Sequence, residues 1–155
     1  KNIDYTKSYS SKSKMGGGVH LDLIHEIDYL IYLFGIPKEI RKQYRKVSKL
    51  NIDSNDYAHF LATYDNFSAS ITLNYYRRDP KRIFEIISEN ETIELDFIRG
   101  TVTDLKTQKV LLKIDSDGFK SSYLDQMSYF LDCAKKNQMP MNSLKESLNV
   151  IKEVL

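Results

Sequence analysis

The feature that most constrains the fold is a run of short segments in which apolar and polar residues alternate, from residue 39 to residue 114. The alternation is clearest over residues 67–75. A period of two places successive side chains on opposite faces of a strand, so the pattern predicts a sheet with one buried and one wetter face. Strands are expected at residues 39–49, 57–64, 67–76, 82–88, 91–98, 101–106 and 109–114.

The connections between these segments are short, and Asp65-Asn66 and Asn90-Glu91 are pairs typical of tight turns. Segments of helical period precede and follow the strands, at residues 20–34, 122–136 and 143–155. Strands joined by short turns and bracketed by helices indicate an α+β fold: a mostly antiparallel open β-sheet with α-helices packed on one face.

Composition narrows the class of protein. The 155 residues are 41% hydrophobic, which suits one compact domain with its own core. Lys and Arg number 23 against 21 Asp and Glu, so no strong field attracts nucleic acid or an anionic membrane. No apolar run approaches the roughly 20 residues that cross a bilayer. The single cysteine, Cys133, cannot form an internal disulfide and indicates a buried side chain in a reducing, cytoplasmic compartment.

The N-terminal segment shows neither helical nor strand periodicity. Residues 1–15 are polar and serine-rich, and they are expected to form an extended connector. Lys1 is neither a natural first residue nor the start of a signal peptide, so the chain is expected to be an internal fragment.

The helix expected at residues 20–34 has a polar face centred on His25. On a wheel of about 100° per residue, Asp22 and Asp28 lie about 60° to either side of it. A histidine flanked by carboxylates suits general acid/base work, because its charge changes near neutral pH. The same spacing describes a solvated face with helix-stabilising pairs, so the residues alone leave both interpretations open.

Three glycines, Gly16, Gly17 and Gly18, precede this helix. They would let an anionic or oxygen-rich ligand approach free N–H groups at a helix N-terminus, although a flexible hinge needs glycines equally. They lack the G-x-G-x-x-G spacing and follow no strand, so no element here is expected to cradle a pyrophosphate. Lys14 could reach a substrate oxygen or be a solvated linker lysine.

The same segment also suggests a metal site, because His20, Asp22, His25 and Glu26 are ligand types that His59 could complete. On a continuous helix His20 lies about 140° from His25, so both cannot face one ion. No metal ligands are therefore predicted, and His59 is expected to be structural.

A cluster of tyrosines and arginines at one strand end, including Tyr76 and Arg78, could bind a phosphate or carboxylate. Solvation of the surface explains such a cluster as well, and no nucleic-acid recognition motif accompanies it. Basic residues in the first strand are expected to keep a sheet edge soluble. They are Arg41, Lys42, Arg45, Lys46 and Lys49.

Several motifs together resemble the C-terminal domain of the Gfo/Idh/MocA oxidoreductases, and the resemblance covers nearly the whole chain. The segment Tyr5-Thr6-Lys7-Ser8-Tyr9-Ser10 is followed by GGGVHLDLIHEIDYLIYLFG. Residues 82–87 leading to residues 91–94 resemble the strand-turn-strand of the family, and residues 123–133 resemble its Y-x-x-Q/E-x-x-x-F helix.

The resemblance implies a glyceraldehyde-3-phosphate dehydrogenase-like domain at residues 19–155, for substrate binding and oligomerisation. Residues 1–18 would connect it to an N-terminal Rossmann domain, absent from this chain, that binds NAD or NADP and supplies a catalytic lysine. His25 would act as acid/base on a sugar hydroxyl as hydride leaves its carbon. Asp22 would bind substrate or orient the histidine. Many members have Asp-x-x-x-His where this chain has Asp22-x-x-His25, and both spacings keep the pair on one helical face.

The substrate implied is a sugar or nucleotide-sugar, and the implied partners are the Rossmann domain and a second copy bound through the sheet face. The alternative is a non-catalytic binding or oligomerisation module that uses the sheet. No cofactor-binding residue is predicted in this chain, which alone is expected to be inactive. The residues predicted to bind substrate are Lys14, Gly17, Gly18, Asp28, Tyr76 and Arg78.

Overall fold

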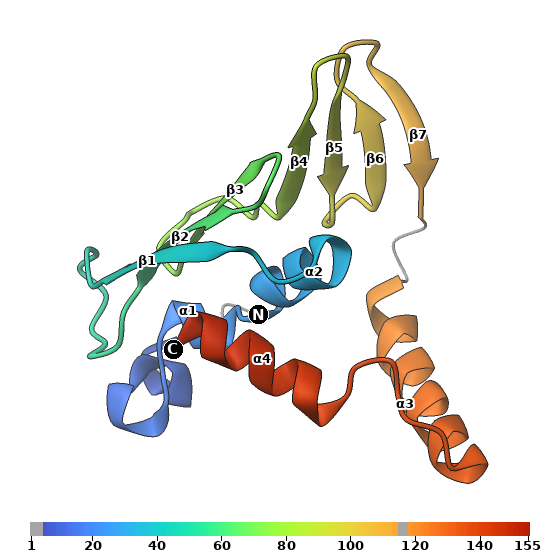
Figure 1. Ribbon diagram of the computed structural model, residues 1–155. Coiled ribbons are helices and arrows are strands. Elements are labelled where there is room, and N and C mark those ends of the chain that lie inside the picture. Colours follow the sequence, from blue (N-terminus) through green and yellow to red (C-terminus); the bar gives the residue numbers. More distant parts are fainter. Residues whose placement is uncertain (1–4, 115–117) are drawn as a thin grey trace. The chain divides into compact units, whose positions relative to one another are not determined.

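The computed structural model describes residues 5–114 and 118–155, which form two compact units (Figure 1). Unit 1 combines the described part of Lys1–Arg77 with Asn142–Leu155, and unit 2 is Arg78–Met141. Residues 1–4 of the predicted connector lie outside the described residues. None of the described helices is both long and apolar enough to span a membrane.

Unit 1 contains a three-stranded antiparallel sheet in the order β1-β2-β3. The backbone N–H of Tyr64 donates to the carbonyl of Phe67 at 3.0 Å and closes the predicted turn between β2 and β3. Strand β1 lies at a sheet edge, as predicted, but it ends at Arg45, so Lys46 and Lys49 follow the strand rather than lie in it. The strands are β1 (Glu39–Arg45), β2 (Tyr57–Thr63) and β3 (Ser68–Asn74).

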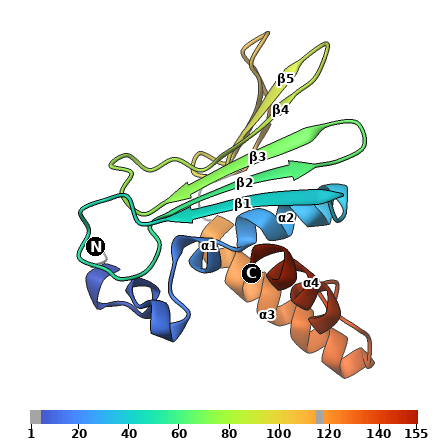
Figure 2. The same ribbon diagram turned by 60° about the vertical axis from the view of Figure 1, so that its left-hand side comes forward.

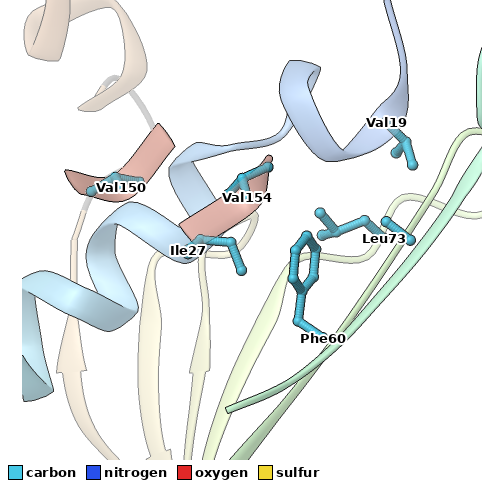
Figure 3. Packing of buried hydrophobic residues seen from close by; sticks show 7 residues of the cluster. Val19, Ile27, Phe60, Leu73, Val150 and Val154 are labelled. Carbon is cyan, nitrogen blue, oxygen red and sulfur yellow. The ribbon is translucent and has the colours of Figure 1, made fainter. Parts of the chain in front are cut away.

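Helices α1, α2 and α4 lie on one face of this sheet (Figure 2). They span Val19–Asp22, His25–Phe34 and Leu144–Val154. Figure 3 shows the core that they form with β2 and β3, in which the ring of Phe60 is completely buried. Burial of one such side chain stabilises the fold by roughly 2 kcal/mol. The buried cluster comprises Val19, Ile27, Ala58, Phe60, Leu73, Val150 and Val154.

The single helix predicted for residues 20–34 is wrong at one point, because α1 ends at Asp22 and α2 begins at His25. Between them the Ile24 N–H donates to the Leu21 carbonyl at 3.4 Å, a tighter turn than an α-helix makes. On a continuous helix Leu21 would lie about 40° from His25, on the polar side. The break instead lets Leu21 pack against the core.

The connector is not extended as expected, because its described residues form three short 3-10 helices. Ser10 and Ser11 are buried. The Ser54 hydroxyl donates to the Ser10 carbonyl at 2.6 Å, and the Asp53 N–H donates to the Ser11 carbonyl at 3.0 Å. The loop between β1 and β2 therefore satisfies the polar backbone of this segment. The helices are η1 (Tyr5–Lys7), η2 (Tyr9–Ser11) and η3 (Ser13–Met15).

Unit 2 contains a four-stranded antiparallel sheet in the order β4-β5-β6-β7, with a bulge between Val102 and Thr103. The Ser88 N–H donates to the Glu91 carbonyl at 2.9 Å and closes the predicted turn between β4 and β5. The elements are β4 (Ile83–Ile87), β5 (Thr92–Asp96), β6 (Thr101–Asp104), β7 (Lys109–Lys113) and α3 (Gly118–Lys136).

Helix α3 differs from the other helices in its burial. Cys133 is buried, as predicted, with 7% of its surface exposed. The apolar stripe expected to pack on the sheet is exposed, with Leu124 at 71% and Met127 at 58%. The α+β class with open antiparallel sheets is confirmed, but the strands form two sheets rather than one. Pro80 lies between them and cannot donate a sheet hydrogen bond.

Candidate functional site

Asp22, the last residue of α1, accepts hydrogen bonds from three side chains. Ser10 Oγ and Tyr9 Oη donate to its Oδ1 at 3.0 and 3.3 Å, and Tyr75 Oη donates to its Oδ2 at 3.2 Å. A carboxylate offers about four acceptor positions, so most of them are occupied. The carboxylate therefore has a fixed orientation and links η2, α1 and the chain just after β3.

Ser10 is itself held firmly. Its carbonyl accepts the Gly18 N–H at 3.0 Å and the Ser54 hydroxyl at 2.6 Å, while its own hydroxyl donates to Asp22. Only 4% of its surface is exposed. Because both the carbonyl and the hydroxyl of Ser10 form hydrogen bonds, this residue is a rigid support for Asp22.

Tyr75 is fixed through Asp56, whose carbonyl accepts the Tyr75 N–H at 3.0 Å. Asp56 is completely buried. Its carboxylate accepts the backbone N–H groups of Val47 and Ser48 at 2.8 and 3.0 Å, and the Ser48 hydroxyl as well. Burial raises the pKa of Asp56, but these hydrogen bonds outweigh it and hold the pKa below its ordinary value.

His25 begins α2 and points into solvent, with 48% of its side chain exposed. Its Nε2 lies 3.1 Å from Oε1 of Glu26, whose side chain is only 12% exposed. Within residues 5–114 and 118–155, no hydrogen bond joins Asp22 to His25. The two residues predicted to work together are therefore near in sequence but have separate partners.

The glycine turn is closed rather than open. The N–H groups of Gly17, Gly18 and Val19 donate to the carbonyls of Lys12, Ser10 and Asn55 at 3.0, 3.0 and 2.9 Å. These three amides therefore already donate within the chain. They are not the free N–H groups that the predicted ligand contact requires. A Cβ on Gly17 would lie 2.5 to 2.7 Å from three carbonyl oxygens, so close packing explains this glycine.

Lys14 and Asp28 differ in their surroundings. Lys14 lies on η3 and is exposed. Asp28 is partly buried on α2, one turn after His25 and on the same side of the helix. Asp28 is therefore the predicted carboxylate that remains beside His25 on one continuous helix.

Tyr76 and Arg78 belong to different units, because unit 1 ends its first segment at Arg77. Tyr76 is partly buried and Arg78 is exposed. The neighbouring Tyr75, which was not predicted to bind substrate, is the tyrosine of this cluster that contacts Asp22.

His20 is buried and faces away from solvent. Its ring stacks on Tyr44 with centroids 4.2 Å apart, and its Nδ1 has no hydrogen-bond partner among the described residues. Burial lowers the pKa of His20. His20 therefore does not share a surface with exposed His25, and no group of three potential metal ligands occurs in the part of the chain that the structure describes.

Sequence reasoning missed the three hydroxyl donors to Asp22. Tyr9 and Ser10 lie in a segment without helical or strand periodicity, and the family resemblance included them without giving either a role. Tyr75 had a usable signal, because the alternation of β3 places it on the buried face, and a buried tyrosine hydroxyl usually needs a partner.

Solved structures share the fold of this chain. An oxidoreductase from Agrobacterium radiobacter, solved with NAD+, L-tartaric acid and magnesium, matches 99% of this chain at 18% identity and a TM-score of 0.75. Biliverdin reductase from Synechocystis sp. PCC 6803, solved with biliverdin and NADP+, matches 94% at 15% identity and a TM-score of 0.75. UDP-N-acetylglucosamine 3-dehydrogenase from Acidithiobacillus ferrooxidans matches 88% at 19% identity and a TM-score of 0.70. The fold is thus that of one domain of oxidoreductases.

The family follows from the sequence. The model of the GFO/IDH/MocA C-terminal domain matches residues 2–94, more than half of the chain. The chain belongs to this family. It spans 49%, 47% and 44% of the three structures just named, in that order. No curated protein sequence matches it.

Proposed function

We propose that this chain is the substrate-side domain of an NAD(P)-dependent oxidoreductase in which His25 transfers the proton. The observation that carries the proposal is the exposed imidazole of His25 at the start of α2, three residues after Asp22, a carboxylate that three hydroxyl groups hold in place. Membership of the GFO/IDH/MocA C-terminal domain family supports it.

The proton path follows from the chemistry of an alcohol. During oxidation, the substrate C–H leaves as hydride, the C–O bond becomes a carbonyl, and the hydroxyl proton passes to the neutral imidazole of His25. In reduction His25 returns that proton to the new alkoxide. A nicotinamide cofactor, when bound, accepts or supplies the hydride.

The cofactor would be bound mainly by a Rossmann domain outside this chain. The glycine turn supports this division, because its amides already donate to backbone carbonyls and do not fit a pyrophosphate. Residues 1–18 would form the connection, and residues 19–155 would form the substrate domain.

We propose a sugar or nucleotide-sugar as the substrate. Asp22 retains about one free acceptor position, which suits a further hydroxyl group. Asp28 and Lys14 would contact other oxygens of the ligand, and Tyr76 would contact an anionic part of it. Arg78, the first residue of unit 2, remains a separate prediction of an anion contact. Gly17 and Gly18 would act indirectly, because the closed turn that they form sets the start of α1. UDP-N-acetylglucosamine 3-dehydrogenase, which shares the fold, is consistent with this class.

The alternative is a non-catalytic module that binds or oligomerises through its sheet. An observation in unit 2 favours it: the register of β4 to β7 aligns Phe84, Leu95, Val102 and Leu112 in one apolar row, and 53% of Leu112 is exposed. Such a row is a suitable surface for a second copy of the chain. The two functions are compatible, since an enzyme can also oligomerise.

We also propose a cytoplasmic location, because the lone cysteine fits a reducing compartment.

The catalytic assignment is tested by His25→Ala in a protein that joins this chain to its nucleotide-binding domain, with NAD(P)H absorbance as the measurement. We expect kcat to fall by about 10² to 10⁴, with partial recovery on adding imidazole. His59→Ala is the matched control, because His59 is also accessible but lies on β2. Unchanged turnover in His25→Ala would exclude His25 as the acid/base.

A further inference from the structure

Glu26 contacts the imidazole of His25 at a specific atom. Its Oε1 lies 3.1 Å from Nε2, within hydrogen-bond distance. An ionised carboxylate only accepts hydrogen bonds and attracts an N–H group, so its position beside Nε2 favours the tautomer that carries the proton on Nε2. A neutral imidazole has one N–H, and Nδ1 is therefore left with the lone pair.

The position of Glu26 on the helix explains how neighbouring residues can touch. Consecutive helical side chains point about 100° apart and do not normally meet. Helical side chains lean toward the N-terminus, and Glu26 is long enough to bend back over His25 at the first turn. With only 12% of its side chain exposed, Glu26 is confined, whereas His25 is 48% exposed. The confined partner therefore sets the orientation of the freer one.

We propose that Glu26 is the positioning residue of His25: it holds the Nε2–H tautomer and leaves Nδ1 as the atom that exchanges a proton with substrate. This inference rests on the proposed acid/base function of His25. It gives Glu26 the orienting task that the resemblance suggested for Asp22, whose acceptor positions are mostly occupied by Ser10, Tyr9 and Tyr75.

The chain contains an internal reference with the opposite arrangement. His59 has its Nδ1, rather than its Nε2, engaged at 3.1 Å with Oγ1 of Thr72. The two accessible histidines should therefore react at different ring nitrogens. Buried His20 should react slowly at either atom.

The test is methylation of the 155-residue chain with a methyl sulfonate ester at pH 8. An imidazole nitrogen takes the methyl group through its lone pair and the sulfonate leaves. Peptide chromatography with isomer standards distinguishes the Nδ1-methyl from the Nε2-methyl product at each histidine. We expect Nδ1-methyl as the main product at His25 and Nε2-methyl at His59.

The variant Glu26→Ala should lower the Nδ1 to Nε2 ratio at His25 by roughly fivefold or more and leave the ratio at His59 unchanged. Glu91→Ala, an exposed glutamate of a turn, is the control and should change neither ratio. Circular dichroism of each variant checks that the chain stays folded. Main reaction at Nε2 of wild-type His25, or an unchanged ratio in Glu26→Ala, would overturn the proposal.

The methylation result does not depend on activity. If Glu26 sets the ratio but His25→Ala retains full turnover, the acid/base function fails while the contact stands. If His25→Ala is inactive but the Nδ1 to Nε2 methylation ratio at His25 is the same in Glu26→Ala as in wild type, only the positioning role of Glu26 is excluded. In the active protein, Glu26→Ala should lower kcat more than it changes KM, and Glu26→Asp should restore part of the loss.

Discussion

At the scale of single residues, Gly17 occupies a position with no room for a side chain. The carbonyl oxygens of Ser10, Lys12 and Tyr9 surround the place where its Cβ would be, at 2.5, 2.7 and 2.7 Å. All three belong to backbone, which cannot move aside as a flexible side chain can. This glycine therefore controls whether the N-terminal segment closes onto α1.

We expect Gly17→Ala to destabilise the chain by about 2 kcal/mol or more, because overpacking against backbone forces the turn to shift. Gly16→Ala is the matched control: its Cβ would meet nothing within 4 Å, and the positive φ of +76° costs about 1 kcal/mol. Urea unfolding measures both. Equal stability of the two variants would show that the turn is not tightly packed.

His20 gives the chain a dependence of stability on pH. Burial lowers its pKa in the folded state below 6.5, so the unfolded chain binds a proton more readily. The free energy of unfolding should therefore be highest above pH 6.5, fall as the pH drops through this value, and level off below the folded-state pKa. We expect His20→Phe to flatten this slope between pH 7.5 and 5.5 in urea unfolding.

His59→Phe is the control for this prediction, since His59 lies on the accessible face of β2 and should leave the slope unchanged. An identical slope in wild type and His20→Phe would show that His20 does not account for the acid sensitivity.

At the scale of elements, the sequence predicted every strand to within a few residues, because alternation is set by burial of one face. It did not predict the break between α1 and α2. Leu21, Leu23 and Ile24 all pack against the core, although a straight helix would spread them over about 160°. Apolar content alone cannot reveal such a slip, and so the predicted pairing of Asp22 with His25 on one helix could not be corrected from the sequence.

Helix α4 begins with a capping box. The Glu146 N–H donates to Ser143 Oγ at 3.3 Å, and the Glu146 carboxylate accepts the Ser143 N–H at 2.7 Å. We expect Ser143→Ala to cost about 1 kcal/mol, measured by urea unfolding. Ser128→Ala, within α3, should change stability by less than about 0.5 kcal/mol. A loss in Ser128→Ala as large as that in Ser143→Ala would contradict the importance of the cap.

At the scale of the whole molecule, burial is unequal between the units. Strand β2 is central in its sheet and carries fully buried Ala58 and Phe60. The side chains of α3 from Ser122 to Lys136 are exposed except for Cys133. The sequence could not predict this difference, because Leu124 and Met127 have the same periodicity whether or not a partner covers them.

We expect amide hydrogen exchange to be roughly tenfold or more faster in α3 than in β2, because few apolar contacts oppose local opening of α3. Mass spectrometry of peptides from both elements measures it, with β5 as a reference inside unit 2. Protection of α3 equal to that of β2 would mean that its apolar stripe is covered in solution.

The core of unit 1 draws on residues from both sides of unit 2 in the sequence. A nascent chain that has emerged from the ribosome only as far as Met141 contains all of unit 2 but lacks Val150 and Val154. During that interval the core around Ile27 and Phe60 lacks the side chains of α4. The Tyr44 hydroxyl also lacks its acceptor, the carbonyl of Val154. Because α4 follows unit 2 in the sequence, its residues are the last of this core to be synthesised. The core beneath α2, the helix that begins with His25, is therefore completed only after translation has passed His25 by more than a hundred residues.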